Sequence, residues 1–232
     1  MSTVNRTALL GSLRGRLIVS CQASAPSPLR RSDIIAALAE CAVLGGAAGV
    51  RIDAPEDVAA ARARVRVPIV GLFKQRTGSP IYITPTFEAA QAVARAGADI
   101  VAVQATRERD EHAEPLGPLL ERLHRECGVL VMADVSTRDE GIAAEAAGAD
   151  VVATTMAGYT PHSRQIPGPD LRLIEELAAA LSVPIVAEGR IQTPDEAAAA
   201  RRAGAWTVVV GRAITMPEAI TARFAKAIED AG

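Results

Sequence analysis

The stretches ARAGADIVAV (94–103), EAAGADVVAT (145–154) and RRAGAWTVVV (201–210) repeat one pattern along the chain. In each, an alanine-rich segment of helical spacing passes through a glycine into a short apolar run. A glycine at such a place ends a helix in a left-handed conformation that other residues adopt only at a cost. The three stretches therefore predict repeated helix-to-strand junctions.

Short and almost continuously apolar runs occur eight times in the sequence. Such runs are typical of parallel strands covered on both faces. Eight alternating strand and helix units without a long linker predict a single-domain α/β protein, a (β/α)8 TIM barrel. We expect residues 1–15 to form an N-terminal extension or short helix and residues 16–232 to form the barrel. The predicted strands are LIVSC (17–21), AGVRI (48–52), VPIVGL (67–72), ADIVAV (98–103), VLVMAD (129–134), DVVATT (150–155), VPIVAE (183–188) and WTVVVG (206–211).

Residues that cap helices precede several of the predicted helices. Ser32, Ser136 or Thr137, and Thr193 stand shortly before acidic residues, and Pro194 suits the first position of a helix. These signals support the division into repeated units.

Composition and charge exclude several classes of function. The formal net charge is −2 and the pI is near 6.0, so the chain offers no basic surface for nucleic acid. No stretch reaches the roughly 18 apolar residues of a membrane helix, and the start lacks the features of a signal peptide. We therefore expect a cytoplasmic protein that binds a small molecule.

The cysteines and histidines predict neither disulfides nor a metal site. The three cysteines have unrelated spacings and are expected to be buried thiols. None of the three histidines ends a predicted strand. No glycine-rich dinucleotide fingerprint follows the first strand, so no nicotinamide cofactor is predicted. The residues concerned are Cys21, Cys41, Cys127, His112, His124 and His162.

Polar residues gather where the predicted strands end, which is where a barrel carries its active site. Lys74 follows the third strand and is either a functional group or a solvated loop lysine. Arg51 and Asp53 can act in the site or form an ion pair at its rim, and Asp134 can instead cap a helix. Glu188 directly follows an apolar strand, where an unpaired buried carboxylate is costly, so we expect it to be functional.

The last two predicted strands are each followed by a glycine and an arginine. Barrels often bind phosphate on the backbone N–H groups of these two loops, which glycine leaves accessible. A neighbouring guanidinium adds a charge-assisted hydrogen bond. Gly189, Arg190, Gly211 and Arg212 are therefore candidates for phosphate binding, although glycine there is also common as a plain turn.

Together, the strand ends resemble the N-acetylmannosamine-6-phosphate 2-epimerase family over about residues 16–224. The resemblance implies a barrel enzyme that converts N-acetylmannosamine 6-phosphate to N-acetylglucosamine 6-phosphate in amino-sugar and sialic acid breakdown. It implies no cofactor, a sugar phosphate as partner and a homodimer. The motifs that carry it are LIVSCQA (17–23), GVRI (49–52), GLFK (71–74), SPIYITPT (79–86), MADVST (132–137), TTMAGYT (154–160), VPIVAEGRIQTP (183–194) and VVVG (208–211).

The resemblance also implies roles for individual residues. The catalytic lysine and glutamate of the family fall on Lys74 and Glu188. Inversion at C2 of the open-chain aldehyde needs a base that removes the proton and an acid that stabilises the enolate or returns the proton. Lys74 can be the base if a dry or cationic pocket destabilises its ammonium. Candidates for sugar binding are Gln22, Arg51 and Asp134, by the resemblance, and Thr155, by its place at the end of the sixth strand.

Three departures from the family pattern bear on the choice of substrate. Family members commonly read DAT after the fourth strand, where this chain has a neutral amide at Gln104. Met216 stands in place of a phosphate-binding arginine, while Arg212 replaces a small residue one helical turn earlier, so a relocated guanidinium can still reach the anion. Gln75 follows the lysine in place of an arginine.

Two other functions remain open from the sequence. A lyase would use Lys74 to form a Schiff base with a keto sugar acid or its phosphate. A barrel that binds a sugar phosphate without catalysis would account for the changes at Gln104 and Met216, but it has no need of both Lys74 and Glu188.

Overall fold

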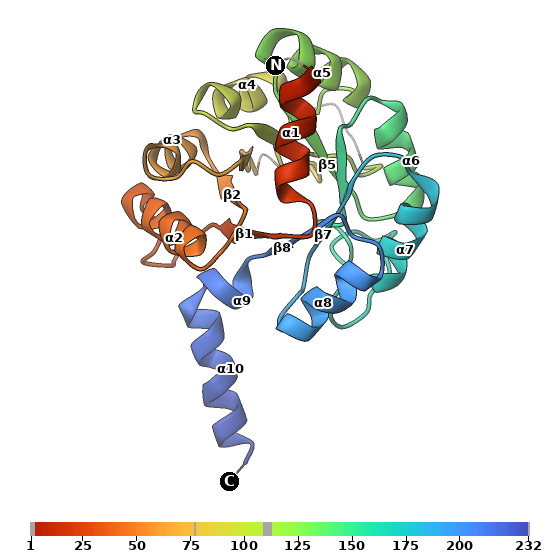
Figure 1. The fold of residues 1–232 in the computed structure, drawn as a ribbon. Helices are drawn as coiled ribbons and strands as arrows, with labels where there is room; N and C mark the ends of the chain where they lie inside the picture. Colours follow the sequence, from red (N-terminus) through yellow and green to blue (C-terminus); the bar gives the residue numbers. More distant parts are fainter. Residues whose placement is uncertain (1–2, 77, 109–112, 232) are drawn as a thin grey trace.

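The computed structural model describes residues 3–76, 78–108 and 113–231 and contains a closed parallel barrel of eight strands in sequence order. Helices surround the barrel, as Figure 1 shows, and the predicted (β/α)8 fold is confirmed. The strands are β1 Leu17–Cys21, β2 Gly49–Asp53, β3 Ile69–Leu72, β4 Ile100–Gln104, β5 Leu130–Asp134, β6 Val151–Ala153, β7 Ile185–Glu188 and β8 Thr207–Val210. The helices are α1 Thr3–Leu13, α2 Ser32–Leu44, α3 Pro55–Arg64, α4 Phe87–Arg95, α5 Leu116–Arg122, η1 Leu123–Cys127, α6 Arg138–Ala146, α7 Leu171–Ala180, α8 Pro194–Arg202, α9 Arg212–Thr215 and α10 Pro217–Glu229.

The three junction glycines follow the ends of α4, α6 and α8. Gly97, Gly148 and Gly204 have φ angles of 109°, 98° and 108°, which confirms the left-handed conformation expected of them. Each glycine lies two residues after the last residue of its helix, in the turn that leads to the next strand.

The predicted helix starts are confirmed at two of three places. Thr137 and Thr193 accept the hydrogen bonds of capping boxes at the starts of α6 and α8. The prediction for Ser32 is wrong, because its hydroxyl donates to Asp57 at 2.5 Å instead of capping α2. Asp57 on the neighbouring helix α3 binds the Ser32 hydroxyl, and the spacing of residues in the sequence does not reveal this contact.

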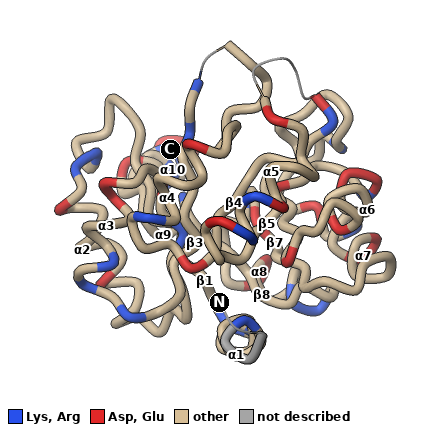
Figure 2. Tube along the Cα trace, turned by 90° about the horizontal axis from the view of Figure 1, so that it is seen from above, with Lys and Arg blue, Asp and Glu red and all other residues tan. Residues whose placement is uncertain are grey.

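Helix α1 lies at the end of the barrel opposite the strands' carboxyl ends, at the bottom of Figure 2. Leu13 is 2% exposed and packs with Ile18 in the apolar core inside the barrel. The indole nitrogen of Trp206 donates to the Leu10 carbonyl at 3.3 Å. The helix thereby packs against that end of the barrel.

The cysteine prediction is correct for Cys21 but wrong for Cys41, which is exposed on α2; Cys127 is intermediate. The three lie on different elements, and the apolar character of α2 does not distinguish its inner face from its outer face.

Within the described residues, no group of three or more His, Cys, Asp or Glu side chains has a metal-binding arrangement. In the same residues, no helix has both the length and the apolar character needed to cross a membrane. His112 lies outside the described residues.

Candidate active site

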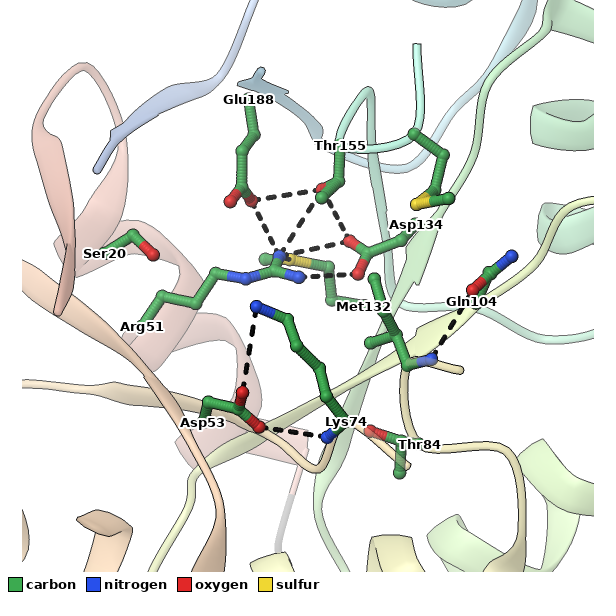
Figure 3. A network of polar contacts seen from close by, with 12 residues as sticks. Ser20, Arg51, Asp53, Lys74, Thr84, Gln104, Met132, Asp134, Thr155 and Glu188 are labelled. Atoms are coloured by element: carbon green, nitrogen blue, oxygen red, sulfur yellow. Dashed lines mark hydrogen bonds and ion pairs between the residues drawn. The ribbon is translucent and has the colours of Figure 1, made fainter. Parts of the chain in front are cut away.

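A pocket of about 680 Å³ opens at the carboxyl ends of the strands. Its wall contains all but one of the predicted site residues, and Figure 3 shows the polar contacts among them. The exception is Asp134, which is completely buried below the pocket floor. The predicted residues in the wall are Gln22, Arg51, Lys74, Thr155, Glu188, Gly189, Arg190, Gly211 and Arg212.

Arg51 forms the floor of the pocket and is only 1% exposed. Its guanidinium reaches from β2 across the barrel to β5, where Nη1 and Nη2 donate to the two carboxylate oxygens of Asp134 at 3.1 and 2.6 Å. The bidentate pair fixes the plane of the guanidinium. Asp134 therefore orients Arg51 instead of capping a helix, and Arg51 forms no rim ion pair with Asp53.

Glu188 completes this network from the end of β7. Its Oε2 accepts a hydrogen bond from Arg51 Nη1 at 2.7 Å and lies 3.1 Å from the Thr155 hydroxyl oxygen. Thr155 also lies 2.7 Å from Asp134 Oδ1, so the hydroxyl links the two carboxylates. Burial raises the pKa of Glu188, Arg51 opposes the shift and Asp134 adds to it. The side chain is still 14% exposed, so Glu188 can contact a ligand in the pocket.

Lys74 reaches the same pocket from the segment that follows β3. Its Nζ donates to Gln22 Oε1 at 2.5 Å and lies 3.7 Å from Asp53 Oδ2. Burial lowers the pKa of Lys74, with Asp53 opposing the shift and the positive charge of Arg51 adding to it. A lowered pKa increases the share of neutral amine near neutral pH, and only the neutral amine can accept a proton.

The backbone around Lys74 is held from two sides. Asp53 Oδ1 accepts the Lys74 N–H at 2.9 Å, and Lys74 pairs with Ile83 in an isolated antiparallel bridge. Lys74 therefore lies in a segment whose backbone is held in place, and its side chain lines the pocket.

The four residues predicted to bind phosphate all line the pocket. Gly189 has a φ of 111°, and a Cβ on Gly211 would lie 3.0 Å from Ser20 Cβ, so both places favour glycine. Arg212 is exposed in the first turn of α9 and lines the pocket. The guanidinium of Arg190 instead packs on Gly158 and donates to the Ile166 carbonyl, which ties the β6–α7 loop to the end of β7.

The charge of the pocket wall favours an anionic ligand. Among the described residues, six basic side chains and two carboxylates line it. The basic side chains are Arg30, Arg51, Lys74, Arg76, Arg190 and Arg212, and the carboxylates are Asp53 and Glu188.

Gln104 and Met216, which mark two of the three departures from the family pattern, lie in different places. Gln104 is 2% exposed and does not line the pocket. Its Oε1 accepts from the Tyr82 backbone N–H at 3.1 Å and its Nε2 donates to the Pro80 carbonyl at 3.0 Å. It therefore holds the segment that pairs with Lys74. Met216 lines the pocket beside Arg212.

Some of the pocket residues were not singled out from the sequence. Asp53 was expected either to act in the site or to form a rim ion pair, and no contact with Lys74 was predicted for it, yet it contacts both the backbone and the amine of Lys74. Its place at the end of β2 was a usable signal. Arg30 and Tyr82 come from loops whose sequence gives no indication that they turn toward the pocket.

Comparisons with known proteins agree with this geometry. Residues 35–230 match the model of a family described as "Putative N-acetylmannosamine-6-phosphate epimerase". A relative from Caldanaerobacter subterraneus is 46% identical over 96% of this chain and 94% of its own, and one from Thermosynechococcus vestitus is 51% identical over 89% and 90%. Both are named "Putative N-acetylmannosamine-6-phosphate 2-epimerase". The solved N-acetylmannosamine-6-phosphate 2-epimerase from Clostridium perfringens superimposes with a TM-score of 0.91 at 40% identity, over 94% of this chain and 95% of that one.

Proposed function

Because the chain belongs to the N-acetylmannosamine-6-phosphate epimerase family, we propose that it converts N-acetylmannosamine 6-phosphate into N-acetylglucosamine 6-phosphate. The observation that carries the proposal is the meeting of Lys74, Arg51 and Glu188 in one positively charged pocket. The reaction inverts C2, whose proton is acidic only when C1 is an aldehyde. The pocket must therefore bind the open-chain sugar, remove that proton and stabilise the enolate.

Lys74 is the base in this proposal. Burial and Arg51 lower the pKa of its amine, and Gln22 Oε1 orients the amine by accepting a hydrogen bond from Nζ at 2.5 Å. The bond from C2 to hydrogen breaks as the amine takes the proton, and the electron pair moves onto the C1 oxygen. A proton delivered to the opposite face of C2 then gives the other epimer.

Arg51 and Glu188 act on the oxygen side of the reaction. The guanidinium is fixed by Asp134 and contributes a positive charge where the enolate oxygen becomes negative. The pKa of Glu188 is raised by burial, so its carboxyl can hold a proton and donate it to oxygen or to the opposite face of C2. Exchange of the C2 proton with solvent in Lys74→Met and Glu188→Gln tests which residue acts on which face of C2.

Arg212 is proposed to bind the phosphate in place of the arginine that Met216 replaces. We expect Arg212→Ala to raise KM for N-acetylmannosamine 6-phosphate about 10- to 100-fold with little change in kcat, because a charged hydrogen bond contributes roughly 1.5–3 kcal/mol. Steady-state kinetics measures both constants. Arg202→Ala, on the exposed face of α8, is the matched control. Recovery of KM in Arg212→Ala/Met216→Arg supports the relocation, whereas an unchanged KM in Arg212→Ala excludes it.

Asp53 makes the pH dependence of catalysis testable. Its carboxylate raises the pKa of Lys74, which burial and Arg51 lower. Asp53→Asn removes that charge, so the pKa of Lys74 falls further and the amine loses its proton at lower pH. The acidic limb of kcat/KM against pH therefore moves to lower pH, while Asp57→Asn on α3, outside the pocket wall, leaves it unchanged. Movement to higher pH rules out Lys74 as the base.

A Schiff-base lyase is the second candidate, since a lysine of lowered pKa also suits attack on a carbonyl. The sequence contains two lysines, Lys74 and the exposed Lys226. Borohydride treatment of the protein with N-acetylmannosamine 6-phosphate should leave Lys74 unmodified, as mass spectrometry of the peptide shows directly. Trapped sugar on Lys74 would favour the lyase, and formation of the gluco epimer without trapping supports the epimerase.

The homodimer stays a prediction of the resemblance, and the cytoplasmic location stays a prediction from the sequence. Sedimentation velocity of the purified chain and fractionation of cells test them separately.

A further inference from the structure

The hydroxyl of Thr155 contacts two carboxyl groups but has only one hydrogen to donate. Its oxygen lies 2.7 Å from Asp134 Oδ1 and 3.1 Å from Glu188 Oε2, and Figure 3 shows both contacts. The single hydrogen can make one of these hydrogen bonds. The other contact is a hydrogen bond only if the carboxyl group supplies a hydrogen of its own.

Arg51 does not supply the second hydrogen. Its Nη1 carries two hydrogens, which are donated to Asp134 Oδ1 at 3.1 Å and to Glu188 Oε2 at 2.7 Å. The distance from Nη1 to the Thr155 hydroxyl oxygen is longer, at 3.5 Å. The second hydrogen therefore has to come from one of the two carboxyl groups.

Asp134 is the carboxyl group that stays ionised. Its two oxygens accept hydrogen bonds from both terminal nitrogens of Arg51, and its side chain is completely buried. A bidentate pair with a guanidinium needs the charged carboxylate. The contact of Thr155 with Asp134 is also shorter than its contact with Glu188. The hydrogen of Thr155 therefore points to Asp134.

Glu188 has the contact that lacks a hydrogen. The charged side chains that act on it are those of Arg51, Asp134 and Lys74, and its neighbours on β6 and β8, Thr154 and Val209, are uncharged. Burial raises the pKa of Glu188, the two cations oppose the shift, and the carboxylate of Asp134 adds to it. A protonated Glu188 can donate to the Thr155 oxygen at 3.1 Å. An ionised Glu188 faces that oxygen with no hydrogen between them.

We propose that Thr155 is a positioning residue that favours the protonated form of Glu188, because it donates its hydrogen to Asp134 and accepts one from Glu188. The three groups then form a chain of two hydrogen bonds in which each hydrogen is used once. One guanidinium, that of Arg51, faces one carboxylate. Thr155 thereby keeps the proton donor of the proposed reaction in its acid form. The hydrogen bond itself does not depend on the proposed function, whereas its effect on turnover does.

The opposite direction of the hydrogen bond would have the opposite effect. A hydrogen donated by Thr155 to Glu188 would stabilise the ionised carboxylate and lower its pKa. Removal of the hydroxyl would then raise the pKa of Glu188. In the arrangement proposed here, removal of the hydroxyl lowers it. The sign of the change therefore distinguishes the two arrangements.

Infrared spectroscopy measures the ionisation of Glu188 directly, because a protonated carboxyl and a carboxylate absorb at different frequencies. The bands of Glu188 are those missing from the spectrum of Glu188→Gln, and they are followed against pH without substrate. We expect Thr155→Val, which replaces the hydroxyl by a methyl group, to move the midpoint to lower pH by roughly 0.4–1 unit, the contribution of one hydrogen bond.

Three further variants control this titration. Thr155→Ala removes the same hydroxyl with less volume and should titrate as Thr155→Val does. Thr155→Ser keeps the hydroxyl and should restore the midpoint. Thr221→Val removes an exposed hydroxyl on α10 and should leave the midpoint unchanged. A midpoint that moves to higher pH or stays in place in Thr155→Val overturns the proposal, as does a Thr155→Ser variant that titrates like Thr155→Val. A Glu188 that is ionised at every pH at which the unchanged protein is folded overturns it too.

Turnover connects the hydrogen bond to the proposed function. Above the midpoint, a shift of this size lowers the protonated fraction of Glu188 about 3- to 10-fold. We expect kcat of Thr155→Val to fall by about that factor and kcat of Thr155→Ser to stay near that of the unchanged enzyme. A shifted midpoint with unchanged turnover supports the hydrogen bond and overturns only the role of Glu188 as proton donor.

Discussion

Lys74→Met lowers kcat/KM by about 10²–10⁴-fold, the usual contribution of a positioned acid or base. Methionine keeps most of the length and apolar stem of lysine but carries no amine, so the proton at C2 has no acceptor at that place. The side chain of Lys74 is 34% exposed and contacts Gln22 and Asp53, both at the pocket surface, so the folded structure does not depend on it. Steady-state kinetics and thermal unfolding measure the two effects.

The sequence supplies a matched control for this variant. Lys226, the other lysine, is 74% exposed on α10, and Lys226→Met makes the same chemical change away from the pocket. We expect its kcat/KM to equal that of the unchanged enzyme. If Lys74→Met turns over at a similar rate to Lys226→Met, another group is the base.

We expect Glu188→Gln to lower turnover by a comparable factor, again about 10²–10⁴-fold. Glutamine keeps the shape and can still accept hydrogen bonds from Arg51 and Thr155, but it neither carries a charge nor releases a proton. The guanidinium of Arg51 remains paired with Asp134, so the buried network keeps its main ion pair. The change should therefore act on turnover more than on the midpoint of thermal unfolding.

Glu121→Gln, at a side chain 73% exposed on α5, controls for loss of a carboxylate. Turnover of Glu188→Gln within a few-fold of that control would remove Glu188 from the chemistry. Unfolding at a much lower temperature would instead make its role structural.

The position of the site was predictable because it follows from the order of the fold. In a closed parallel barrel the carboxyl ends of all strands meet at one end, so Arg51, Lys74 and Glu188 converge there although they lie far apart in the chain. Eight apolar runs were enough to establish that order. Strand edges differ by at most two residues from the prediction, for example at Ile69 and Ile185, where a proline precedes the strand.

The pairing within the site was not predictable from sequence. Arg51 reaches across the barrel to Asp134 on β5, a contact that depends on which side chains point inward and how far each extends. Gln104 was noted as a departure that bears on the choice of substrate, and the sequence does not show that its amide holds backbone groups of residues 80–83. Arg190 was assigned to phosphate from its place after Gly189, yet its guanidinium contacts the Ile166 carbonyl. In each case a tertiary contact decides the direction of a long side chain.

The proton at C2 of the substrate gives the most direct test of the central claim, that this pocket epimerises by removing and returning that proton. Proton NMR follows the purified protein with N-acetylmannosamine 6-phosphate in deuterium oxide. We predict that the signals of N-acetylglucosamine 6-phosphate appear with deuterium at C2, and that Lys74→Met produces neither change. An epimer that keeps its original C2 proton, or folded protein that leaves the substrate unchanged, would contradict the account.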